Sequence, residues 1–94
     1  MDRYTQRIGN SYYVANEKTI QNDNGCTGDA IEMLAKFENY YNDLVLKQEQ
    51  IIKEMEKLKS ENKTHTVKFR QLLANKLNNS SNLLILNQFG IQYK

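Results

Sequence analysis

The chain has 94 residues, of which 39% are hydrophobic and 26% are charged, and its formal net charge is +2. This length suits one small domain (residues 1–94), which buries only about 60–65% of its unfolded surface, and no apolar run approaches the ~18 residues that a membrane span needs. The single cysteine, Cys26, excludes a disulfide within the chain, and the opening residues lack the apolar core of a secretory signal. We therefore expect a cytoplasmic protein that has no membrane partner.

Residues 1–15 are expected to form a short β-hairpin. Two β-prone segments, residues 4–8 and 11–14, flank the pair Gly9-Asn10, which is the kind of two-residue connection that closes tight hairpins. An isolated hairpin is only marginally stable in water, so its apolar side chains should lie against a helix or a second subunit. Residues 16–28 are rich in Asn, Asp, Gly and Thr, and are expected to form a loop.

The longest predicted element is a helix over residues 29–61. Asp29 is expected to cap its start, with Glu32 completing a capping box, and Thr27 is an alternative cap. A heptad frame with Leu34 at an a position places an apolar residue at every d position over four heptads, which is typical of a coiled coil. The stripe predicts an oligomer interface made of Leu34, Phe37, Tyr41, Leu44, Gln48, Ile51, Met55 and Leu58.

This stripe could be covered in two ways. Residues 67–89 could fold back over part of it within one chain, but two short helices cannot cover a helix of about 48 Å at ~1.5 Å per residue. We therefore expect self-association into a homo-oligomeric helical bundle. Gln48, a polar residue in an apolar row, should fix the register of that bundle at a cost in stability.

Two short helices are expected after a polar break at residues 59–66. Thr66 is a suitable cap for a helix from Val67 to about Leu77, and Gly90 is well placed to end the helix after it. The apolar face of the first helix consists of Phe69, Leu72, Leu73 and Leu77. Residues 78–81 are expected to form the turn between the two helices. The predicted fold is thus mainly α, with a short N-terminal hairpin, one long coiled-coil-like helix and a helical hairpin over residues 66–90.

Charge is segregated along the chain. Residues 1–61 contain all 11 acids and 8 of the 13 bases, which gives −3, whereas residues 62–94 contain five bases and no acid, which gives +5. A basic segment without acids suggests an anionic partner, and ordinary solvated lysines are the simpler alternative. The candidate binding residues for such a partner are Lys68, Arg70, Gln71, Asn75 and Lys76. Two short helices joined by a turn also resemble a helix-turn-helix in outline, which makes DNA or RNA a possible partner.

The sequence offers little for catalysis. His65 is the only histidine and lies in a polar linker, while Cys26 has no basic neighbour that would lower the pKa of its thiol. One Cys and one His cannot build a zinc site within one chain. We therefore expect no enzymatic activity, no catalytic residue, no metal and no cofactor.

Two segments resemble small proteins of Firmicutes phages and prophages. Residues 28–38 read GDAIEMLAKFE and are similar to an A-I-x-x-L-A-x-[YF]-E start, and residues 63–77 read KTHTVKFRQLLANKL and are similar to a C-terminal module of the same proteins. The resemblance implies a phage origin and the cytoplasm of a bacterial host cell. Small accessory phage proteins often block host machinery, including defence systems, and some sequester small signalling molecules.

The expected function is therefore that of a non-enzymatic, homo-oligomeric phage accessory protein that acts by binding. A host-directed or counter-defence role, in which it blocks a host protein or sequesters an anionic ligand, is the first expectation. A nucleic-acid-binding accessory protein and a purely structural oligomer are the alternatives.

Overall fold

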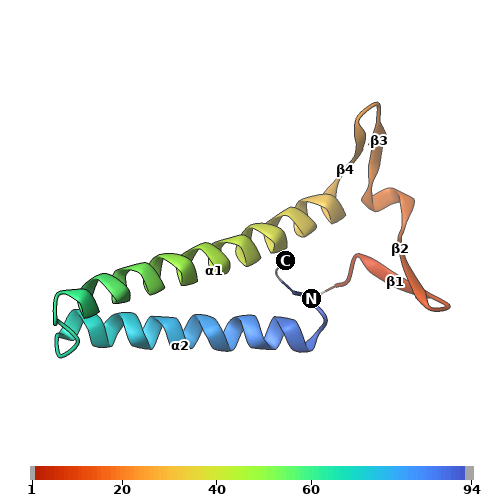
Figure 1. Ribbon diagram of the computed structural model, residues 1–94. Coiled ribbons are helices and arrows are strands. Elements are labelled where there is room, and N and C mark those ends of the chain that lie inside the picture. The colour runs from red at the N-terminus through yellow and green to blue at the C-terminus, as the bar shows by residue number, and fades with distance from the viewer. Residues whose placement is uncertain (1, 93–94) are drawn as a thin grey trace. The chain divides into compact units, whose positions relative to one another are not determined.

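The computed structural model describes residues 2–92 and is mainly helical, as the sequence predicts (Figure 1). Two antiparallel hairpins precede two helices, in the order β1 (Thr5–Ile8), β2 (Ser11–Val14), a 3-10 turn η1 (Asn16–Lys18), β3 (Ile20–Asn22), β4 (Gly25–Thr27), α1 (Asp29–Ser60) and α2 (Val67–Gln88). The chain divides into two compact units, with the boundary inside α1 between Asn39 and Tyr40. Both hairpins and the start of α1 belong to the first unit, and the rest of α1 and α2 belong to the second.

The predicted first hairpin is confirmed. Strands β1 and β2 pair antiparallel, so that Gln6 lies opposite Tyr13 and the two residues of the link connect Ile8 to Ser11. Gly9 has φ of 57°, a conformation that suits glycine at the first position of a tight hairpin turn. The Tyr13 hydroxyl donates to Gln6 Oε1 at 2.7 Å, which adds a cross-strand side-chain bond to the backbone ladder.

The prediction of a loop over residues 16–28 is wrong, because this segment contains the turn η1 and a second hairpin. Strands β3 and β4 pair Ile20 with Thr27 across a two-residue turn. The Asn22 side chain accepts a bond from the Asn24 backbone N–H at 3.1 Å, a local bond that favours the turn. Each strand has only three residues, which is too short for a period-two pattern to stand out in the sequence.

Gly28 joins the second hairpin to α1 in a conformation that only glycine adopts without strain. Its φ is 116°, and a Cβ atom there would lie 2.8 Å from the Lys18 carbonyl oxygen. Gly28→Ala should therefore destabilise the first unit by more than the ~1–3 kcal/mol typical of a strained backbone conformation. Gly25→Ala is the matched control, because Gly25 has φ of 134° and a Cβ atom there would have no neighbour within 4 Å. Thermal denaturation that gave both variants the same melting temperature would contradict the close approach.

α1 extends over 32 residues and closely matches the helix predicted for residues 29–61. The Gly28 carbonyl accepts from the Glu32 backbone N–H at 3.0 Å, so Asp29 is the first helical residue and not the cap that the sequence suggests. At the other end, Asn62 takes a left-handed conformation with φ of 58°, and the Lys63 backbone N–H donates to the Leu58 carbonyl at 2.8 Å. This pair of features ends the helix in a Schellman motif.

The prediction of two short helices with a turn at residues 78–81 is wrong, because α2 is unbroken over 22 residues. Asn and Ser favour turns because their side chains compete for backbone hydrogen bonds. Here the Ser81 hydroxyl donates to the Leu77 carbonyl of the preceding turn at 3.0 Å, and the Ser80 hydroxyl accepts from Gln48 of α1 at 2.7 Å. These bonds are compatible with the helix, and packing on α1 outweighs the low helix propensity of the segment.

Both predicted ends of the C-terminal helical region are confirmed. Thr66 caps α2, since its hydroxyl accepts from the Phe69 backbone N–H at 3.3 Å. Gly90 has φ of 85°, and the Ile91 backbone N–H donates to the Leu86 carbonyl at 3.0 Å, which closes a second Schellman motif.

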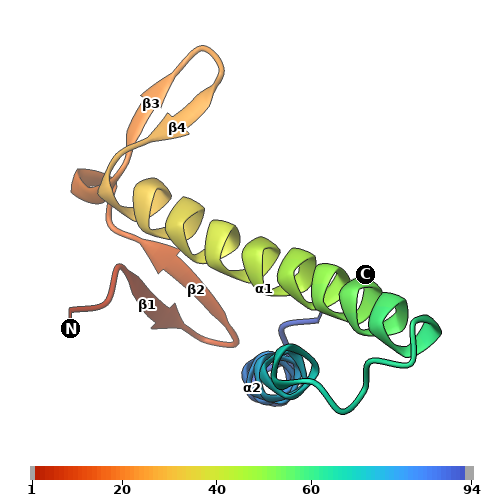
Figure 2. The ribbon, with the colours of Figure 1, turned by 90° about the vertical axis from the view of Figure 1, so that its left-hand side faces the viewer.

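The helices of the second unit run in opposite directions because a loop of six residues joins them (Figure 1). Figure 2 looks nearly along α2 and shows it beside one flank of α1. Met55 and Leu58 of α1 pack against Leu72 of α2, and Ile51 and Phe69 lie around this cluster. The core is small, and even its most buried side chain, Met55, retains 5% of its exposure.

Candidate binding surfaces

The predicted anion-binding residues do not form one patch. Lys68, Gln71 and Asn75 are exposed and share one face of α2 by their spacing of three and four residues. Arg70 is exposed, but at ~100° per residue it lies on a different side of the helix. Lys76 is half-buried, and its backbone carbonyl accepts from the Gln48 side chain of α1.

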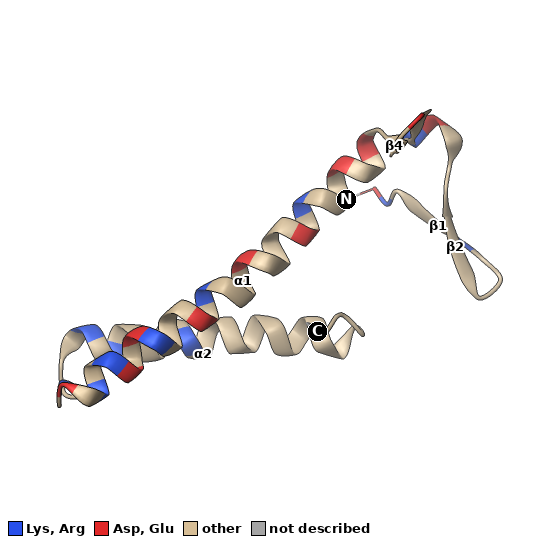
Figure 3. Cartoon of the chain, turned by 45° about the horizontal axis from the view of Figure 1, so that its top comes forward, with Lys and Arg blue, Asp and Glu red and all other residues tan. Residues whose placement is uncertain are grey.

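Acidic and basic residues are also less separated in the folded chain than they are in the sequence. Figure 3 shows acidic and basic residues together where the end of α1 meets the start of α2, whereas the second half of α2 carries no charge. Glu54 and Glu61 of this region line the same pocket as Lys57, Lys63 and Lys68. Lys68 of α2 therefore has acidic neighbours.

One of these basic residues is paired with an acid. The Lys63 ammonium lies 3.1 Å from the Glu61 carboxylate, and this hydrogen bond and charge lower the pKa of Glu61. Lys63 consequently contributes less positive potential than a lone lysine at that position.

The predicted oligomer interface divides into a part that the chain itself covers and a part that stays open. Within the second unit, Leu44, Met55 and Leu58 are buried, while Tyr41, Gln48 and Ile51 are half-buried. α2 thus covers the part of the stripe that holds Ile51, Met55 and Leu58. Within the first unit, Leu34 and Phe37 remain 52% and 37% exposed.

An apolar groove of about 440 Å³ runs along this open part of the stripe. The start of α1 forms one side of it, and residues of and next to the first hairpin, among them Tyr4 and Val14, form the other. Ala30 is buried there, and Leu34 and Phe37 line the open side. The expectation that the apolar side chains of the hairpin lie against a helix is met only in part, because Tyr4 and Val14 line this groove while Ile8 and Tyr12 remain 63% and 56% exposed.

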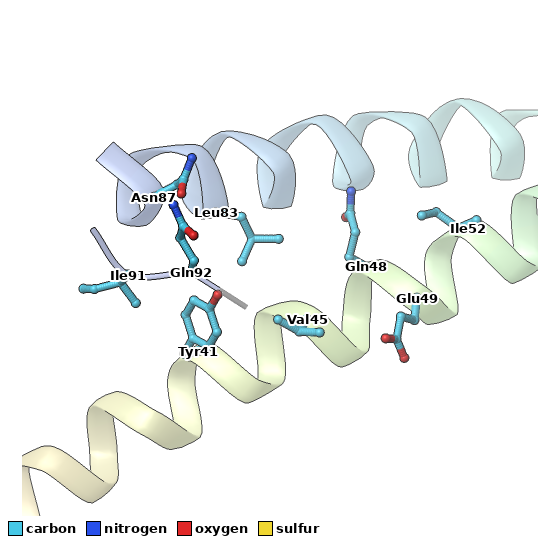
Figure 4. Close-up of a pocket in the computed structure, with 9 residues that line it drawn as sticks. All are labelled: Tyr41, Val45, Gln48, Glu49, Ile52, Leu83, Asn87, Ile91 and Gln92. Carbon is cyan, nitrogen blue, oxygen red and sulfur yellow. The ribbon is translucent and has the colours of Figure 1, made fainter. Parts of the chain in front are cut away.

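Gln48 connects the two helices of the second unit (Figure 4). Its Nε2 donates to the Lys76 carbonyl at 3.3 Å and to the Ser80 hydroxyl at 2.7 Å, whereas its buried Oε1 has no partner among the described residues. The side chain lies beside a cavity of about 600 Å³ that Val45 and Leu83 also line. Gln48 therefore bonds to two successive turns of α2, and its Oε1 is left without a partner among the described residues.

This arrangement predicts a non-additive pair of substitutions. Ser80→Ala alone should destabilise the unit by about 1 kcal/mol, because the Gln48 amide loses its shorter bond. Gln48→Leu should raise the melting temperature, since it removes the unpaired Oε1. In the Gln48→Leu background, Ser80→Ala should cost almost nothing. Urea denaturation of the four proteins measures this coupling, and strictly additive changes would contradict the bond between the two side chains.

An apolar strip on one flank of α2, next to the side that meets α1, was missed at the sequence level. Leu73, Leu77 and Leu84 are 39%, 59% and 57% exposed, whereas the sequence suggests that Leu73 and Leu77 are buried with Phe69 and Leu72. Leu73 follows Leu72 directly in the sequence, and a helix directs successive side chains to different sides. The row of Leu73, Leu77 and Leu84 is therefore separate from the face of Phe69 and Leu72. A longer window would have revealed this strip, because Leu73, Leu77 and Leu84 keep heptad spacing only if the helix is continuous.

The remaining candidates for chemistry are isolated. Cys26 is exposed in β4, and His65 is exposed in the loop between the helices. Within residues 2–92, no group of three or more His, Cys, Asp or Glu side chains is arranged to hold a metal ion. Neither helix in this described range is long and apolar enough to cross a membrane.

Comparisons with protein-family models, with curated proteins and with solved structures found no match to this chain.

Proposed function

We propose that this protein is a homo-oligomer that acts by binding, without enzymatic activity. The observation that carries the proposal is how little apolar surface one chain covers. Among residues 2–92 six apolar side chains are buried, while large ones stay exposed along both helices. A small domain with so small a core gains most of its additional stability by burying such surfaces against another subunit.

The proposed biological role is that of a phage accessory protein directed at its host, including a counter-defence role. Its support is the resemblance of residues 28–38 and 63–77 to small phage proteins. Such a protein would block a host protein or sequester an anionic ligand, and would do so in the host cytoplasm.

The proposed contact for an anionic partner is the exposed polar face of α2. Lys68, Gln71 and Asn75 offer one ammonium and two amides on a single side of the helix, with Arg70 and Lys76 on separate flanks. This set suits a partner that combines negative charge with hydrogen-bonding groups, such as an acidic protein surface or a phosphorylated ligand.

Nucleic acid is less well supported as a partner. The helix-turn-helix outline requires a turn at residues 78–81, where α2 is continuous. DNA or RNA binding would therefore rest on the basic residues alone and would weaken steeply with salt.

Native mass spectrometry of the protein purified from its host tests the proposal directly. We expect an integer multiple of the 11.0 kDa chain mass, together with a bound host protein or a bound anionic ligand. A bare monomer under conditions that preserve known weak dimers would overturn the proposal. An oligomer with no partner would support the purely structural alternative.

A further inference from the structure

The exposed apolar strip of α2 has the pattern of a helix–helix interface. Leu73, Leu77 and Leu84 occupy a and d positions of one heptad frame, and Ser80 takes the d position between Leu77 and Leu84. All four residues are exposed in the single chain, and Ser80 lies at the edge of the strip nearest to α1, where its hydroxyl accepts from Gln48. We propose that α2 pairs through this strip with α2 of a second copy, antiparallel and about a two-fold axis. The inference rests on the proposed self-association and names its surface.

A second copy fits this strip because the surface around its middle and its C-terminal end is uncharged. From Leu77 to Gln92 there is no Asp, Glu, Lys or Arg, and Asn, Ser and Gln lie beside Leu77 and Leu84, whereas Arg70 and Lys76 flank Leu73. In a two-fold interface each patch meets its own copy, so any charge near the axis would face a like charge. A strip without charges avoids that repulsion, and Asn and Ser can donate and accept in either subunit.

One register gives every residue of the strip a facing residue in the partner subunit. Leu73 and Leu84 lie equally far on either side of a point between Asn78 and Asn79, and so do Leu77 and Ser80. With the two-fold axis at that point, Leu73 faces Leu84 of the partner subunit. Leu77 then faces Ser80 of the partner subunit, and a large side chain opposite a small one allows the helices to approach closely.

The positions of the basic residues favour the antiparallel orientation. In this register the two Arg70 side chains are about 26 Å apart along the helices at ~1.5 Å per residue. This separation is well beyond the Debye length of ~8–10 Å, so salt screens the repulsion between them. In a parallel pair the two Arg70 side chains would lie side by side. Lys76, the base nearest to the axis, is half-buried on the side of α2 that meets α1.

Cysteine cross-linking tests the surface, the orientation and the register together. All variants carry Cys26→Ser, because Cys26 is exposed and would react. With a short bismaleimide, Leu77→Cys should cross-link to its own copy, since it lies next to the axis. Leu73→Cys alone should not cross-link. A mixture of Leu73→Cys and Leu84→Cys proteins should give a mixed dimer.

Each other outcome overturns the inference in a recognisable way. Efficient cross-linking of Leu73→Cys to itself would indicate parallel helices. If light scattering shows an oligomer but none of these cysteine variants cross-links, the interface lies elsewhere and the proposed function stands. A monomer at all concentrations would overturn both.

A pair of charge substitutions gives an independent measure. Leu77→Glu/Leu84→Glu should weaken self-association by at least about 100-fold, because symmetry places buried charges on both subunits. Far-UV circular dichroism should remain that of the wild type, since both side chains are exposed in one chain. Ile85→Glu is the control, because Ile85 is 51% exposed on another side of α2. Equal loss of association in the control, or none in the double variant, would contradict the proposed strip.

Discussion

Met55→Asp is expected to abolish the folded helical hairpin of the second unit. Met55 is 5% exposed and packs with Leu58 and Leu72 in the cluster that joins the two helices. A carboxylate there would be buried without a partner, at a cost of several kcal/mol. Small domains have about 5–15 kcal/mol of stability in total, and this core is small even for its class. Far-UV circular dichroism at about 25 °C should therefore show a large loss of helix.

Leu46→Asp is the matched control for this substitution. Leu46 is 55% exposed and, at ~100° per residue, lies on the side of α1 opposite to Met55. The same change of chemistry should therefore cost little there, about the difference in helix propensity. If Met55→Asp retained the helicity and melting temperature of the control, α2 would not cover α1 as the structure describes.

Lys68→Glu/Arg70→Glu is expected to have the largest effect on binding. Both side chains are exposed, so the variant should keep its helicity and its oligomeric state. Each charge contact that becomes desolvated in the complex contributes roughly 1–3 kcal/mol, which corresponds to a loss of about 10²–10⁴-fold for two contacts. The loss would be much smaller if both contacts stayed exposed to water. Isothermal titration against the partner found by mass spectrometry measures it.

Lys18→Glu/Lys36→Glu controls for net charge, because it makes the same change at two exposed lysines of the first unit. We expect near wild-type binding from this control. Unchanged binding by a correctly assembled Lys68→Glu/Arg70→Glu protein would show that the bases of α2 are only solvated. The partner would then have to bind elsewhere, and the exposed tyrosines of the first hairpin, Tyr12 and Tyr13, together with Tyr4, would be the next candidates.

Local signals in the sequence were sufficient wherever one residue type has a single structural use. The link at Gly9 closes a hairpin, Thr66 caps a helix and Gly90 ends one, as predicted. The error over α2 arose where local preference and packing disagree. Residues 78–81 favour a turn by composition, but the contact between Ser80 and Gln48 is made with an unbroken helix and joins residues far apart in the sequence.

The helix that carries the heptad stripe was predicted with nearly the correct bounds, but what covers the stripe could not be derived from periodicity. An apolar stripe indicates that a helix is covered and does not say by what. Met55 and Leu58 pack within the chain against Leu72, and the open apolar surface lies at Leu34 and Phe37 and on the flank strip of α2. The continuity of α2 places Leu84 in one row with Leu73 and Leu77.

Sedimentation velocity of the wild-type protein over a hundredfold dilution, with helicity followed in parallel, tests the proposed self-association most directly. We expect a species of at least twice the 11.0 kDa chain mass at micromolar concentration, which dissociates on dilution and loses thermal stability as it does so. A monodisperse 11.0 kDa monomer with full helicity and an unchanged melting temperature at every concentration would contradict it.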